Sequence, residues 1–75
     1  MDKAQKAARC KVIFEDEVFK EAVNVVKEYH TSTFLRPNAT DEDVMEARRM
    51  VLALTEVVNQ LATFIADDRI ARGRR

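Results

Sequence analysis

The chain has 75 residues with 13 basic and 13 acidic side chains, so its formal net charge is zero. Its length allows one domain, residues 1–75, which can bury only about 60% of the surface of the unfolded chain. One cysteine, Cys10, and one histidine, His30, exclude an intramolecular disulfide and a zinc site of the usual Cys and His ligands. A chain this short without either device is expected to need oligomerisation or a partner.

The N-terminal segment, residues 1–14, contains no glycine or proline and is predicted to be helical. A break is predicted near residues 13–16, where Glu15 or Asp16 can cap a new helix. A single helix over residues 2–35 is the alternative, because the apolar residues before the break stay in phase with those after it.

A first long helix is predicted over residues 17–35, because its apolar residues form two adjacent stripes at helical spacing. One stripe consists of Val18, Ala22, Val25 and Tyr29, and the other of Phe19, Val23, Val26 and Phe34. Together the stripes cover about half of the helix circumference, whereas an ordinary surface helix has an apolar arc of roughly 100°. One neighbouring helix cannot cover such an arc.

The turn is predicted at residues 36–40. Pro37 disfavours helical geometry at the residue before it, and Thr40 and Asp43 have the spacing of a shortened capping box for the next helix. A connection of about five residues normally returns the chain antiparallel to itself. The two helices are therefore predicted to form an antiparallel helical hairpin.

The second helix is predicted over residues 41–68, with two overlapping apolar seams. The first seam is Val44, Ala47, Val51, Leu54, Val58, Leu61 and Ile65, and the second is Ala47, Met50, Leu54, Val57, Leu61 and Phe64. The seams together cover an arc of roughly 160°. The sequence thus predicts an all-α fold that associates with itself into a helical bundle.

Self-association is predicted as a dimeric four-helix bundle, with a ring of hairpins as the alternative. The residues predicted to form this or another protein interface are Met50, Val57, Leu61, Phe64, Phe19, Val23 and Val26. A protein partner is expected to use the same residues.

Basic residues are concentrated at the two ends of the chain, the second end being a predicted basic tail over residues 69–75. They are Lys3, Lys6, Arg9 and Lys11 near the start, and Arg69, Arg72, Arg74 and Arg75 near the end. These side chains are candidates for contacts with phosphate groups or with an acidic partner. The alternative is that they complement a helix dipole and raise solubility. No helix face carries a continuous basic stripe, which argues against a protein that reads a nucleic-acid groove.

Residues for catalysis are missing. The single glycine, Gly73, cannot form a phosphate-binding loop, and no Glu-x-x-His motif suggests a di-metal bundle. No enzyme activity, cofactor or metal is therefore expected. No uninterrupted apolar run approaches the ~20 residues of a membrane span, and the N-terminus lacks an apolar stretch of signal-peptide length. We expect no membrane association and an intracellular location.

Three segments follow one another in an order shared with a known family: Phe14–Ala22, the Thr40-Asp-Glu-Asp turn, and a Leu- and Val-rich helix that ends in Phe64–Ala71. Through these segments, residues 12–72 resemble small helical-hairpin proteins of tailed bacteriophages. The resemblance implies a role in virion assembly or DNA packaging, similar to the oligomerisation hairpins of small terminase subunits, and a location in the cytoplasm of a host cell or on a virion. Two other hypotheses remain: a nucleic-acid-binding dimer similar to the Rop-type RNA-binding bundle, and a small inhibitor that caps a host protein.

Overall fold

The computed structural model describes residues 1–73. Within this range it contains only helices: α1 (Lys3–Glu15), α2 (Glu17–Thr31), the short 3-10 helix η1 (Ser32–Leu35) and α3 (Asp41–Gly73). Helices make up 89% of the described residues, and none of these residues lies in a strand. The prediction of an all-α fold is confirmed.

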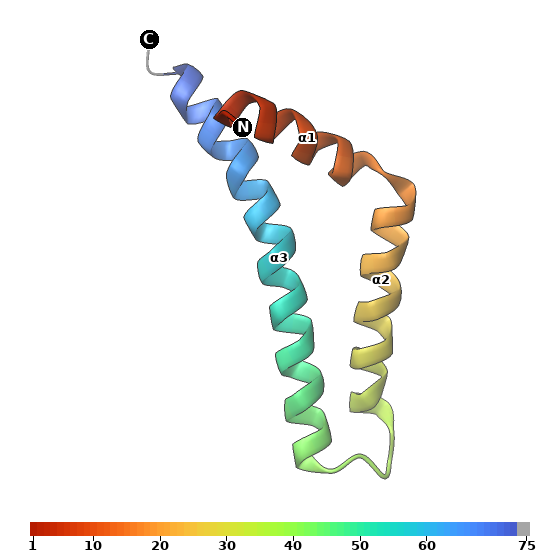
Figure 1. The fold of residues 1–75 in the computed structure, drawn as a ribbon. Helices are drawn as coiled ribbons and strands as arrows, with labels where there is room; N and C mark the ends of the chain where they lie inside the picture. The colour runs from red at the N-terminus through yellow and green to blue at the C-terminus, as the bar shows by residue number, and fades with distance from the viewer. Residues whose placement is uncertain (74–75) are drawn as a thin grey trace.

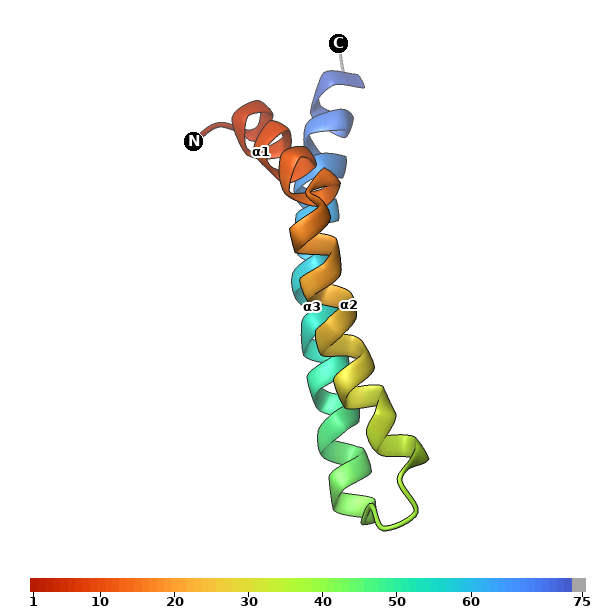
Figure 2. The same cartoon turned by 90° about the vertical axis from the view of Figure 1, so that its right-hand side faces the viewer.

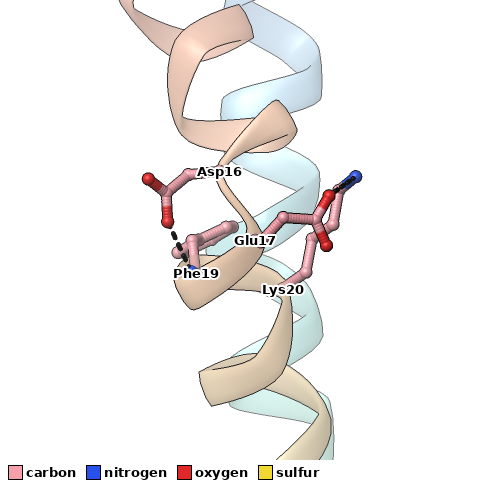
Figure 3. Close-up of polar contacts among 4 residues, drawn as sticks. All are labelled: Asp16, Glu17, Phe19 and Lys20. Carbon is pink, nitrogen blue, oxygen red and sulfur yellow. Dashed lines mark hydrogen bonds and ion pairs between the residues drawn. The ribbon is translucent and has the colours of Figure 1, made fainter.

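The break between α1 and α2 falls at Asp16, within the predicted range, so the alternative of a single helix over residues 2–35 is wrong. Asp16 has extended backbone angles, φ −70° and ψ 122°. Its carboxylate accepts a hydrogen bond of 2.8 Å from the backbone N–H of Phe19, as Figure 3 shows. This cap satisfies one of the free N–H groups at the start of α2 and lets the chain change direction. The neighbouring Glu17–Lys20 ion pair, at 3.5 Å, is exposed and contributes little.

The turn between η1 and α3 has the predicted capping box. The backbone N–H of Asp43 donates to Thr40 Oγ1 at 3.0 Å, and the backbone N–H of Thr40 donates to Asp43 Oδ2 at 3.1 Å. The hydrogen bonds from Thr40, and then the charge of Arg36, lower the pKa of Asp43 below its ordinary value of 3.8. The carboxylate at the start of α3 is therefore charged across the physiological range.

Two helix ends differ from the prediction. The last residues of the first predicted helix, 32–35, tighten into η1, a common form for the final turn before a helix ends. α3 continues to Gly73 instead of ending at residue 68, because the following alanine and arginines favour a helix and Arg72 pairs with Asp68 at 3.1 Å. Arg74 and Arg75 lie outside the described residues.

The helices form an elongated, open arrangement. Figure 1 shows α2 and α3 running in opposite directions on either side of the turn, while α1 turns back at Asp16 and crosses the C-terminal part of α3. Figure 2 shows that α1 also leans out of the plane of α2 and α3. The principal extents are 56 × 23 × 18 Å and the radius of gyration is 16.5 Å, against about 11 Å for a compact domain of this length.

The core is small. Ala7, Cys10 and Ala47 are the only buried apolar residues among those described, and none of the larger apolar side chains is fully buried. Ala7 and Cys10 lie on α1 where it packs against α3, and the ammonium of Lys6 lies 4.4 Å from the centre of the Phe64 ring. α1 is therefore held to α3 by small side chains and one cation–π contact.

We expect Thr40→Ala to lower the free energy of unfolding by about 1 kcal/mol, because the first turn of α3 loses its cap. Urea unfolding followed by circular dichroism measures the change. Thr63→Ala is the matched control, since Thr63 is exposed and its hydroxyl donates to the carbonyl of Asn59 within the helix. An equal effect of the two substitutions would contradict the role of the cap.

We expect Ala7→Asp to destabilise the protein by about 2 kcal/mol more than Ala8→Asp, because only the first places a charge between α1 and α3. Ala7 is buried whereas Ala8, its neighbour on the same helix, is exposed. Both substitutions carry the same cost in helix propensity, so chemical denaturation of the pair isolates the packing contact. Equal stabilities would mean that α1 does not pack on α3 as described.

Candidate interaction face

Two apolar stripes remain in water, one on α2 and one on α3. On α2, the side chains of Val18, Val25 and Tyr29 are 73%, 57% and 73% exposed. On α3, Met50 and Val57 are 43% and 60% exposed. Singly exposed apolar residues are normal on protein surfaces, but residues at i, i+4 and i+7 spacing form continuous stripes. Ala22 and Ala53 fill the spaces within them.

The residues that face the other helix lie beside these stripes. Phe19 and Val23 of α2 are half-buried and line one groove with Val58 of α3. On each helix the exposed stripe comes one position before the contact residues, as Val18 precedes Phe19 and Val57 precedes Val58. Successive helical residues are 100° apart, so each exposed stripe lies about 100° around its helix from this contact. Because both helices are right-handed and run in opposite directions, the two stripes then lie on the same side of the pair.

Surface grooves at the turn agree with this assignment. Tyr29, from the α2 stripe, lines a groove together with Asp43 and Glu46. On α3, Asp43 lies two helical turns before Met50 and Glu46 lies one turn before it. Lys20 and Asn24 line the separate groove beside Val58 instead. We name the side that carries both stripes the open face; it consists of Val18, Ala22, Val25, Tyr29, Met50, Ala53 and Val57.

The exposed area is large for a chain of this size. The accessible surface is 6159 Å² for 8.6 kDa, whereas a folded monomer of that mass exposes about 4,700 Å². The excess of about 1,500 Å² exceeds the roughly 800 Å² that each partner buries in a standard protein interface. The molecule as a whole therefore exposes enough surplus surface to form such an interface, and the open face is where exposed apolar side chains form continuous stripes.

A groove between α1 and α3 continues the open face toward the chain ends. It has a volume of about 520 Å³ and contains Cys10, Val12, Ile13, Leu61 and Phe64, with Lys6 and Arg9 at its charged rim. Leu61 and Phe64 follow Val57 at spacings of four and seven residues, so the stripe on α3 leads directly into the groove. We call this feature the α1 groove.

Charge is distributed unequally along the molecule. Residues 32–46, around the turn, carry four acidic side chains and one basic one, Arg36. At the other end, residues 1–11 and 67–73 carry six basic side chains and three acidic ones. Figure 1 shows these two segments meeting at the end opposite the turn. The long axis therefore runs from an acidic turn end to a basic end.

The apolar residues predicted for the interface divide into three groups in the structure. Met50 and Val57 lie on the open face, and Leu61 and Phe64 are half-buried along the α1 groove. Phe19 and Val23 face α3, and Val26 is 41% exposed between the two α2 stripes. The exposed stripe of Val18, Ala22, Val25 and Tyr29 was not in the predicted interface, since spacing alone does not decide which stripe packs on α3. The larger Phe19 was the available signal, because a ring gains more from burial than a valine does.

The basic residues are likewise in different environments. Lys3, Arg9, Lys11 and Arg69 are exposed. Lys6 lies over Phe64, and Arg72 pairs with Asp68, so both take part in contacts within the chain. Arg74 and Arg75 lie outside the described residues. Four exposed cations from α1 and α3 thus stand at the basic end.

In residues 1–73, no three His, Cys, Asp or Glu side chains are grouped so that they could hold a metal ion. The ring of His30 makes an edge-on contact with Tyr29, with ring centres 5.1 Å apart, and Cys10 is a buried free thiol. The features that the site offers are apolar surface and charge.

α3 is long and apolar enough to cross a membrane when judged by length and composition alone. One such helix is weak evidence, because the core helix of a soluble protein meets the same criteria. Polar residues Glu56, Asn59, Gln60 and Thr63 follow one another along one side of α3, at the spacing of an amphipathic helix. The expectation of no membrane association stays a prediction.

Comparisons with known proteins give no further assignment: no family model, no curated protein and no solved structure matches the chain. The resemblance to small phage hairpin proteins therefore stays a prediction.

Proposed function

We propose that this chain is a non-enzymatic, self-associating helical-hairpin protein that uses its open face as the interface. One observation carries the proposal: an apolar face spans α2 and α3 on a chain whose buried apolar core consists of three small residues in the described range. Burying a valine or methionine side chain fully stabilises by about 1.5–3 kcal/mol. Covering this face would therefore add as much apolar burial as the monomer has in its own core.

The arrangement suits a four-helix bundle built from two copies. In such bundles, each antiparallel helix pair contributes one apolar face and the helices pack at a small crossing angle. The open face has the form of one such half, and α1 stands beside it at one end. A ring of more copies would use the same stripes with a smaller rotation between neighbours than in a two-fold pair.

The biological setting follows from the resemblance alone. An adaptor in virion assembly or DNA packaging of a phage would need a surface that joins copies to one another or to a larger complex. The open face could serve either purpose. An inhibitor that caps a host protein would use the same face on a foreign partner, and would differ in remaining a monomer by itself.

A nucleic-acid-binding dimer is the second candidate function, and one observation favours it. Lys3 and Lys11 on α1 and Arg69 on α3 are exposed. α1 packs against α3, and a dimer would double the number of these cations. Clustered cations attract phosphate backbones without reading sequence.

We expect Val57→Asp to weaken self-association at least about tenfold, because each copy would bury an unpaired carboxylate in the interface. Leu52→Asp is the matched control: Leu52 is 47% exposed on the same helix but points away from the open face. Light scattering and sedimentation equilibrium at micromolar concentration measure the mass. A folded wild-type monomer, or equal effects of the two substitutions, would contradict the proposal.

For the second candidate, we expect exchange of Lys3, Lys11 and Arg69 for glutamine to abolish binding to DNA or RNA while the oligomer mass is unchanged. Fluorescence anisotropy with labelled oligonucleotides at low salt measures the binding, which should fall steeply as salt is raised. Exchange of Lys20 and Lys27, which lie on the side of the helix pair opposite the open face, is the control. If the wild-type protein binds neither nucleic acid at low salt, this function is excluded.

A further inference from the structure

We propose that two copies associate antiparallel through their open faces, so that the turn of each copy lies in the α1 groove of the other. The inference rests on the proposed self-association and adds its partner geometry. Three observations support it: the charge along the face, the direction of the α3 stripe, and apolar side chains at the turn that have no cover in the single chain.

Charge decides between parallel and antiparallel association. Asp43 and Glu46 extend the α3 stripe toward the turn, whereas Lys6 and Arg9 line the α1 groove at its other end. A parallel pair would place like charges together at both ends, at a cost in repulsion. An antiparallel pair places each acidic turn beside a basic groove, which is favourable at both ends at once.

The α3 stripe sets the register. If Met50 of one copy packs against Val57 of the other, two-fold symmetry is centred between residues 53 and 54. Phe64 then lies level with Asp43 of the second copy, because the two residues are equally far along α3 from the centre of symmetry. Since Lys6 covers Phe64 in the single chain, its ammonium would stand beside that carboxylate.

The turn supplies the apolar part of the contact. Leu35 is 86% exposed and Phe34 is 47% exposed at the turn end, where the single chain offers nothing to cover them. The α1 groove, of about 520 Å³ and with apolar walls from Ile13, Leu61 and Phe64, is large enough for one such side chain. In a two-fold pair the groove and the turn would each be used twice, as an isologous interface requires.

Pulsed electron paramagnetic resonance on the full chain tests the orientation. A spin label at Leu35→Cys, in a Cys10→Ala background, reports the distance between the two turns of a dimer. Antiparallel pairing places the labels on the order of 40 Å apart, from the helical rise and the register above. A mixture of chains labelled at Leu35→Cys and at Val12→Cys should add a much shorter distance.

Each outcome separates the two proposals. A short distance between the two Leu35 labels would show a parallel dimer, which overturns the antiparallel arrangement and leaves self-association intact. Monomer mass without intermolecular coupling would overturn both. A long distance accompanied by a mass that grows beyond the dimer would show an end-to-end chain and would also overturn the reciprocal contact.

The salt dependence of the dimer is a second measurement, independent of labels. Antiparallel pairing predicts that dimerisation weakens several-fold between roughly 0.05 M and 0.5 M salt, because screening removes the attraction of opposite ends. Parallel pairing predicts that dimerisation strengthens as salt is raised, since screening would relieve the repulsion between like charges.

Arg9→Glu should weaken dimerisation at low salt, and Arg48→Glu, outside the open face, should not. Strengthening with salt would overturn the proposal.

Discussion

Apolar surface exceeds what three helices of this length can cover, and the rest of the structure follows from that imbalance. α2 and α3 each carry apolar residues over nearly half of their circumference, but each has one long neighbour. The contact between them uses one stripe of each helix and leaves the second stripe exposed. α1 crosses only the C-terminal part of α3 and covers Leu61 and Phe64 in part. The surplus is therefore concentrated on one side of the molecule.

The cap at Asp16 determines where that surplus lies. A continuous helix over residues 2–35 would have run alongside α3, which has 33 residues, over nearly its whole length. The extended backbone at Asp16 instead turns α1 back over α3 and out of the plane of the pair. α1 thus lies beside one end of the open face and forms the α1 groove with the end of the α3 stripe, with Lys6 and Arg9 at the rim. The hydrogen bond from the backbone N–H of Phe19 to the Asp16 carboxylate stabilises the break on which this arrangement depends.

The parts of the fold that depend on local chemistry were predictable from the sequence. The capping box of Thr40 and Asp43, the break near Asp16 and the helical class follow from interactions within a few residues. The spacing of the apolar residues does not decide which α2 stripe packs on α3, because Val18 and Phe19 belong to stripes with the same period. The greater gain from burying the Phe19 ring is the signal that separates the two stripes. The end of α3 was misjudged as well, since charged arginines after Asp68 look like a tail although they are good helix formers. The residues predicted for the interface therefore include the exposed Met50 and Val57 of α3 but not the exposed stripe of α2.

The break at Asp16 also divides the chain into units of unequal stability. Helical hydrogen bonds do not continue across it, so the cooperativity of α2 is not transmitted to α1. α1 is attached to α3 through the buried Ala7 and Cys10 and the Lys6–Phe64 contact, whereas no residue of α2 is buried. Each of the two helices can then separate from α3 without forcing the other to open. In amide hydrogen exchange, residues 3–15 and residues 17–31 would lose protection at different rates and the middle of α3 last, and any contact that fills the α1 groove would slow exchange in residues 3–15 selectively.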